Sequence, residues 1–206
     1  HSSDFRSKKV RASFSNCDRG LIKIMFQNIL LALGLILLAS AAYAGIQGAP
    51  WVPTWKKDLK RIERLVDLQP GEKFVELGCG NGRVCRHLAM TTHAGKIVGV
   101  ELSLLQWGIA KLQVAICRSQ EKFKNFAIAK KDLRIVFGNV FKHPLSEYDV
   151  VYLFLMPETY EKIKPKLELE LKPGARVITY VWPIPGWEED VLDMAEGQPN
   201  LFLYKR

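Results

Sequence analysis

The hydrophobic pattern near the start of the chain is a single uninterrupted apolar run. Residues 24–46 are apolar apart from Gln27, Asn28 and Ser40, and no charged residue follows before Lys56. An α-helix rises about 1.5 Å per residue, so about 20 residues cross a hydrocarbon core of about 30 Å. The pattern therefore predicts one transmembrane helix over residues 24–46, preceded by a basic segment over residues 1–23.

A cleaved export signal is the alternative interpretation of this run. The triplets 39–41 (ASA) and 42–44 (AYA) place small residues where a signal peptidase cuts, and basic residues precede the apolar run. The pattern alone leaves both interpretations open. Lys23 before the run and Lys56 after it belong to basic groups that nearly balance, so the orientation of a membrane helix is poorly specified.

Beyond a linker that carries Pro50 and Pro53, short apolar runs alternate with amphipathic segments. Apolar residues at helical spacing predict helices, and short apolar runs next to Gly or Pro predict strands. The alternation predicts an α/β domain over residues 47–206, with a mostly parallel, doubly wound sheet and right-handed crossovers. The expected strands are 73–77, 96–100, 133–137, 148–155 and 176–181, with two short edge strands, 191–194 and 201–204, and the expected helices are 55–68, 83–90, 104–118 and 158–171.

The composition, 48% hydrophobic and 25% charged over 206 residues, is typical of a folded protein. The formal net charge of +9 favours an anionic partner, either nucleic acid or a bilayer surface. Residues 1–23 carry much of this excess, because only Asp4 and Asp18 oppose their basic side chains, which favours a juxtamembrane segment. The four cysteines and four histidines lack the paired short spacings of a zinc site, so we expect no metal.

A glycine-rich segment, 76–83 (ELGCGNGR), joins the first expected strand to a helix. A phosphate-binding P-loop requires Lys and Ser or Thr after its last glycine, whereas Arg83 and Val84 follow Gly82. A dinucleotide fingerprint requires a glycine three residues after Gly80, and Arg83 stands there. The sequence therefore excludes the two commonest phosphate-binding loops.

The remaining spacing, Glu76-x-Gly78-x-Gly80-x-Gly82, resembles the first motif of the class I S-adenosylmethionine-dependent methyltransferases. The resemblance implies a Rossmann-like fold whose backbone approaches the amino-acid part of S-adenosyl-L-methionine at glycines without side chains. It also implies that Glu101, after the second expected strand, receives the ribose hydroxyls, and that Asn139 lies near the adenine amino group. The cofactor-binding residues that the resemblance implies are Glu76, Gly78, Cys79, Gly80, Asn81, Gly82, Glu101, Leu102, Asn139 and Val140.

Segments outside the glycine loop resemble one group in that family, the membrane-anchored protein-lysine methyltransferases of the adenine nucleotide translocase and the ATP synthase c-subunit. These segments are 50–54 (PWVPT), 102–107, 166–176 (KLELELKPGAR) and 182–187 (WPIPGW). Enzymes that methylate DNA bases or protein glutamine carry Asp/Asn-Pro-Pro-Tyr after the fourth strand, but this chain has LMPE at 155–158. The missing amide or carboxylate disfavours nucleobase and glutamine substrates, whereas a lysine amine needs less help.

Ligands of open α/β sheets bind beyond the carboxyl ends of the strands. We therefore expect Pro157, Glu158 and Trp182 to shape the acceptor channel, as the candidate catalytic residues. Tyr160 and Trp187 fit either this channel or the core.

The resemblance implies N-methylation of a lysine in a membrane-associated protein. The alternatives are methylation of RNA or of a small or lipid-soluble molecule, and a non-catalytic scaffold that keeps the fold. A cytosolic cofactor favours an uncleaved single-pass anchor, with the catalytic domain facing the cytoplasm or an organelle matrix.

Overall fold

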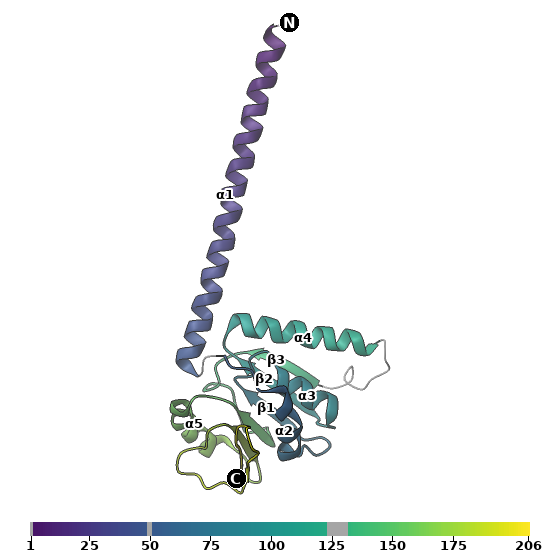
Figure 1. Ribbon diagram of the computed structural model, residues 1–206, viewed down its shortest axis with the longest axis vertical. Helices are drawn as coiled ribbons and strands as arrows, with labels where there is room; N and C mark the ends of the chain where they lie inside the picture. Colours follow the sequence, from purple (N-terminus) through teal and green to yellow (C-terminus); the bar gives the residue numbers. More distant parts are fainter. Residues whose placement is uncertain (1, 49–50, 123–131) are drawn as a thin grey trace. The chain divides into compact units, whose positions relative to one another are not determined.

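The computed structural model describes residues 2–48, 51–122 and 132–206, and Pro50 of the expected linker lies outside these ranges (Figure 1). The chain divides into two compact units, residues 1–39 and residues 40–206. The second unit contains every strand of the sheet described below.

The first unit consists of a long helix, α1 (Ser2–Gln47), whose last turns belong to the second unit. The stretch Gly20–Gln47 is long and apolar enough to cross a membrane, and a signal sequence near the N-terminus meets the same criterion. Leu31, Leu35 and Leu38 each expose more than half of their surface, as lipid-facing side chains do. The predicted helix over 24–46 is confirmed, and its role as an anchor stays a prediction.

The second unit is built around a sheet that has seven strands within the described residues, in the order β3-β2-β1-β4-β5-β7-β6. Strands β1 to β5 are parallel, β7 is antiparallel to β5, and β6 is antiparallel to β7. The order reverses between β1 and β4, which is where doubly wound sheets bind ligands. The strands are β1 (Lys73–Leu77), β2 (Lys96–Glu101), β3 (Asp132–Phe137), β4 (Val150–Leu153), β5 (Arg176–Tyr180), β6 (Val191–Asp193) and β7 (Leu201–Lys205).

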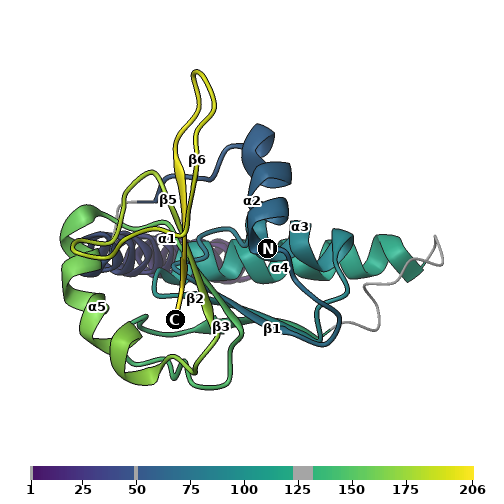
Figure 2. The same ribbon diagram turned by 90° about the horizontal axis from the view of Figure 1, so that it is seen from below.

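Helices cover both faces of this sheet (Figure 2). The helices are α2 (Leu59–Val66), α3 (Arg83–Thr91), α4 (Leu104–Lys122) and α5 (Pro157–Glu170). On one face, Ile62 of α2 and Leu88 of α3 belong to a buried cluster with Phe74 of β1. On the other face, Tyr160 of α5 belongs to a second cluster with Val75. Alternate residues of β1 thus face opposite helical layers, which confirms the predicted doubly wound fold.

Two predicted elements differ from the structure in their bounds. The helix expected over 55–68 is a short 3-10 helix, Lys56–Asp58, followed by α2, which ends where Asp67 takes a left-handed conformation with φ 42°. The strand expected over 148–155 is shortened to β4, because the chain leaves the sheet after Leu153 and Met156 already caps α5. The residues freed from β4 line the pocket described below.

A buried ionic network ties α2 to the C-terminal strands. The Arg61 guanidinium lies 3.1 Å from the Asp58 carboxylate and 2.7 Å from the Asp193 carboxylate, and the Tyr180 hydroxyl donates to Asp58 at 2.6 Å. Breaking such a network leaves a buried charge without compensation and costs about 3 to 5 kcal/mol. The network fixes the start of α2 and, with it, the segment 51–54 that leads into the pocket.

Candidate cofactor and acceptor site

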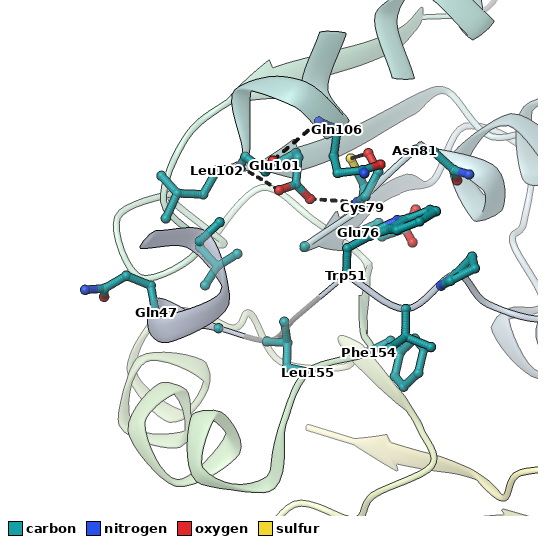
Figure 3. A pocket seen from close by; sticks show the side chains of 18 of the residues that line it. Gln47, Trp51, Glu76, Cys79, Asn81, Glu101, Leu102, Gln106, Phe154 and Leu155 are labelled. Carbon is teal, nitrogen blue, oxygen red and sulfur yellow. Dashed lines mark hydrogen bonds between the residues drawn. The ribbon is translucent and has the colours of Figure 1, made fainter. Parts of the chain in front are cut away.

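A pocket opens beyond the carboxyl ends of β1, β2 and β4, at the reversal point of the sheet (Figure 3). All of the expected cofactor-binding residues line it except Gly82, which is the N-cap of α3. The structure thus brings together residues from three βα connections, and their binding role stays a prediction. The other lining residues are Ala41, Ala44, Gln47, Gly48, Trp51, Val52, Pro53, Thr54, Arg83, Ser103, Gln106, Phe154, Leu155, Met156 and Trp182.

The glycine loop requires glycine for two reasons. Gly78 and Gly80 take positive φ values of 80° and 52°, which side chains disfavour. A Cβ atom on Gly78 would lie 2.9 Å from Leu155 Cδ2, and one on Gly80 would lie 2.7 Å from Trp51 Nε1. The loop is held against β2 because the Gly78 and Cys79 amides both donate to the Val100 carbonyl, at 2.9 and 3.0 Å. The backbone itself therefore forms one wall of the pocket.

Glu101 is held by backbone amides on both sides. Its Oε2 accepts from the Gly80 amide and its Oε1 from the Ser103 amide, each at 2.7 Å. Burial raises the pKa of Glu101 above its ordinary value, and these amide hydrogen bonds act against the shift. Each carboxylate oxygen keeps a free lone pair, so the fixed side chain is able to accept from two vicinal hydroxyls as well.

Glu76 lies deeper than Glu101, at the base of the pocket. Burial raises the pKa of Glu76 to about 8, although the Cys85 amide (3.2 Å) and the Cys85 thiol (3.0 Å) both donate to its Oε2. The charge of Glu101 raises this pKa further. Glu76 is therefore largely protonated at neutral pH, and a cation bound in the pocket would favour its ionised form.

The buried cysteine beside this pair is not a nucleophile. Cys79 lines the pocket, and burial raises the pKa of its thiol well above the ordinary value. A thiol that stays protonated is a poor nucleophile. The pocket therefore offers no covalent cysteine chemistry through Cys79.

The expected adenine end lies where β3 ends. Asn139 and Val140 line the pocket there, opposite Leu102, and Val140 is buried. The Asn139 carbonyl oxygen accepts from the Phe141 amide at 2.9 Å, so a turn already uses one of its lone pairs. Its second lone pair remains for an amino group, which is compatible with the expected contact.

Gln106 is a polar residue of the pocket that the sequence motifs did not indicate. It lies in the first turns of α4, it is only 8% exposed, and its Oε1 is one of the few buried oxygens without a hydrogen-bond partner in the described part of the chain. Figure 3 shows its side chain among Glu101, Cys79 and Asn81. A buried unpaired acceptor is costly unless a ligand donor reaches it. Its spacing after Glu101 on a predicted helix was the only available signal.

The segment before α2 covers part of the glycine loop. The Trp51 ring lies against Gly80, and Arg83 donates to the Thr54 carbonyl, which secures this segment to the start of α3. Sequence reasoning identified 50–54 only as a matching segment and gave it no role at the pocket.

The opposite side of the pocket contains Trp182. The residue before it, Val181, is β-branched and has a φ of 78°, an uncommon and strained conformation. The Thr179 hydroxyl donates to the Trp182 carbonyl at 2.7 Å and stabilises this bend. The bend turns the chain out of β5 and leaves the Trp182 side chain 43% exposed at the pocket.

The other candidate acceptor residues do not line the pocket. Pro157 and Glu158 form the first turn of α5, and their neighbour Met156 lines the pocket instead. Tyr160 is fully buried and its hydroxyl is bonded to the Leu153 carbonyl and the Leu155 amide, so it belongs to the core.

Trp187 also has a structural place. It packs edge-on against Tyr204, with ring centroids 5.5 Å apart, and its indole donates to Glu168. Of the aromatic residues considered for the channel, only Trp182 lies at the pocket.

The last turns of α1 form a further wall. Ala41, Ala44 and Gln47 line the pocket, and the Gly48 carbonyl accepts from the Thr159 hydroxyl at the start of α5. The apolar helix therefore ends as part of the pocket itself.

Comparisons with known proteins agree with this geometry. The family model of the ANTKMT methyltransferase domain matches residues 76–191. A protein-lysine N-methyltransferase from Saccharolobus islandicus (strain REY15A) is 33% identical over 75% of this chain and 91% of that protein. Two lysine N-methyltransferases from Mus musculus are each 28% identical over 75% of this chain: that of the ATP synthase c-subunit, 57% covered, and that of the adenine nucleotide translocase, 62% covered. The chain thus spans less than two thirds of these mouse relatives.

Solved structures share the fold. An RNA methyltransferase from Salinibacter ruber, in complex with S-adenosyl-L-homocysteine, aligns with a TM-score of 0.64 and 27% identity over 75% of this chain and 93% of that chain. An S-adenosylmethionine-dependent O-methyltransferase from Thermotoga maritima aligns with a TM-score of 0.51 and 16% identity over 74% of this chain and 66% of that chain. The second similarity concerns the fold alone.

Proposed function

Because the chain belongs to the ANTKMT family of S-adenosylmethionine-dependent protein-lysine N-methyltransferases, we propose that it methylates a lysine of a membrane-embedded protein. The observation that carries this proposal is the pocket wall formed by Ala41, Ala44 and Gln47, the last turns of the candidate membrane span. A pocket built partly from the end of such a helix opens next to the bilayer surface. The names of the two mouse relatives support a membrane-protein substrate.

The same wall supports an uncleaved anchor. A signal peptidase that cut after Ala41 or Ala44 would remove lining residues from the pocket. Residues 1–23 then form a basic juxtamembrane segment, 24–46 the membrane helix, and 47–206 the catalytic domain. The domain lies on the side of the membrane that contains the cofactor, the cytoplasm or an organelle matrix.

The lining residues fit S-adenosylmethionine. Glu101 would hold the ribose hydroxyls, the backbone at Gly78 and Gly80 the amino-acid part, and Asn139 with Val140 the adenine. The orphaned Gln106 oxygen is a further acceptor for the nucleoside. The bound cofactor supplies a methyl group on a positively charged sulfur, so the protein has to align an amine with it and exclude water.

The acceptor side of the pocket suits a neutral amine. Its described lining residues, among them Leu155, Met156 and Trp182, include no titratable side chain. Such an environment lowers the pKa of an entering lysine, which gives its proton to solvent and keeps a nucleophilic lone pair. The nitrogen then bonds to the methyl carbon while the carbon–sulfur bond breaks and its electron pair stays on sulfur. The second proton of the attacking nitrogen leaves to solvent afterwards.

The test uses the full-length protein reconstituted with membranes and isotopically labelled S-adenosylmethionine. We expect label on lysine in membrane proteins, located by mass spectrometry, and no such label with Glu101→Ala. Label confined to soluble proteins, small molecules or RNA would contradict the proposed substrate class.

RNA is the second candidate substrate. The Salinibacter ruber protein named as an RNA methyltransferase and the net charge of +9 favour it. Binding to phosphates is strongly salt-dependent. Salt-sensitive RNA binding together with label transfer to RNA would favour this candidate over a lysine substrate.

A further inference from the structure

Helix α4 has an apolar face that nothing in the described part of the chain covers. Leu105, Leu112 and Ile116 are 42%, 62% and 46% exposed, and Ile109 between them is partly exposed. Spacings of four, three and four residues place these side chains on one face of the helix. Ala110 and Val114, on another face, are buried in the core. A helix that faces water would carry polar residues at the four exposed positions.

The charges beside this face are positive. Residues 104–120 include Lys111 and Arg118 and no Asp or Glu. Lys111 is exposed, and its Nζ lies 5.1 Å from the centroid of the Trp107 ring. Aliphatic side chains flanked by basic and indole groups are typical of helices that lie in the headgroup region of a bilayer.

The first residue of α4 contacts the end of the candidate membrane span. The Leu104 amide donates to the Ser40 hydroxyl at 2.9 Å. The 20 residues from Gly20 to Ala39 are long enough to cross a hydrocarbon core of about 30 Å. Because Ala41 already lines a pocket that contains buried carboxyl groups, the hydrocarbon has to end near Ser40. Chain continuity alone then brings the start of α4 to the bilayer boundary.

We infer that the face of α4 formed by Leu105, Ile109, Leu112 and Ile116 lies on the lipid surface of the membrane that α1 crosses. This inference rests on the anchoring part of the proposed function. A helix of this kind buries its apolar face about 5 to 10 Å into the interface. Together with α1, the contact fixes the pocket at a constant height above the bilayer, so the enzyme selects lysines at that height.

The test places an environment-sensitive fluorophore on the full chain in a Cys17→Ser, Cys117→Ser background, in which the buried Cys79 and Cys85 stay unlabelled. Leu112→Cys carries the label on the proposed face. Leu169→Cys is the matched control, because Leu169 is a leucine of helix α5 that is 85% exposed. Both proteins are reconstituted in vesicles of phosphatidylcholine and phosphatidylserine, and flotation with the vesicles is measured first.

We expect the label at position 112 to be quenched by nitroxide lipids and to lose quenching by aqueous iodide, with the reverse at position 169. Iodide quenching at 112 equal to that at 169 overturns the lipid contact and leaves the anchor intact. Shielding from iodide without lipid quenching indicates a second copy of the chain and also overturns it. Failure to float with the vesicles contradicts the anchor, and the lipid contact of α4 with it.

Discussion

The two sides of the pocket are built in different ways. The side formed by the glycine loop, Glu101 and Gln106 consists of fixed backbone amides, buried carboxyl groups and a buried amide. The side formed by Leu155, Met156, Trp182 and the end of α1 consists of apolar and partly exposed side chains. The first is the cofactor side and the second is the acceptor side.

This difference follows from what each ligand needs. A nucleoside has hydroxyls and amino groups whose positions must be met by fixed partners, since an unpaired buried polar group costs about 1 to 3 kcal/mol. A lysine amine that attacks a positively charged methyl donor needs alignment and a dry surrounding, which apolar walls supply. Substitutions on the cofactor side should therefore change cofactor affinity, and those on the acceptor side should change the use of the acceptor alone.

The largest effect is expected for Gly78→Ala. The new Cβ lies 2.9 Å from Leu155 Cδ2 at the pocket, so overpacking should weaken binding of S-adenosyl-L-homocysteine by about 2 to 3 kcal/mol, measured by calorimetry. Gly174→Ala is the control, because Gly174 has nearly the same φ (81° against 80°) but open space at its Cβ position. Equal losses in the two variants would show that backbone strain, and not the pocket wall, is responsible.

Glu101→Ala should have the next largest effect. Loss of its charge-assisted hydrogen bonds to the ribose should weaken cofactor binding by about 1 to 3 kcal/mol. An unchanged dissociation constant, with the fold intact by circular dichroism, would refute the ribose assignment.

The buried Glu76 should give the ligand-free protein a pH-dependent stability. Its pKa is about 8 when folded and 4.5 as an ordinary glutamate, so between these values the folded state holds a proton that the unfolded chain releases. The free energy of unfolding should therefore fall as pH rises from about 5 to 8, by at most about 1.4 kcal/mol per pH unit from this group. Denaturant titrations at several pH values should show a flatter dependence for Glu76→Gln, and an unchanged slope would contradict this account.

Gln106→Leu should weaken cofactor binding by about 1 kcal/mol, the value of one hydrogen bond to a neutral group. Gln113→Leu, on the same helix but away from the pocket lining, is its matched control. If calorimetry finds the two variants alike, the unpaired Gln106 oxygen does not face the ligand.

The smallest effect is expected on the acceptor side. Trp182→Ala should raise the KM for a protein acceptor by the equivalent of about 0.5 to 1 kcal/mol and leave the dissociation constant of the cofactor unchanged. Trp187→Ala, which removes a packed tryptophan away from the pocket, should lower the Tm and leave that KM unchanged. A change in cofactor affinity with Trp182→Ala would contradict the division of the pocket into two sides.

The same division explains what the sequence could predict. The glycine spacing and Glu101 lie next to strand ends and depend on local backbone geometry, so the sequence pattern predicted the fold and the cofactor side. Ala41, Trp51 and Gln106 reach the pocket only through tertiary packing of three distant segments, which a pattern of single residues does not specify. Pro157 and Glu158 were expected at the channel, but the early end of β4 brings Leu155 and Met156 there instead.

The participation of Ala41 and Ala44 in the pocket wall also bears on how enzyme and substrate meet. With α1 in a bilayer, both partners diffuse in two dimensions, and a tether of this kind raises the local concentration of the acceptor to about the millimolar range without any additional contact. Weak recognition of the acceptor is then sufficient for turnover. Crowding of the membrane with other proteins, and not the bulk concentration of the substrate, would set the rate.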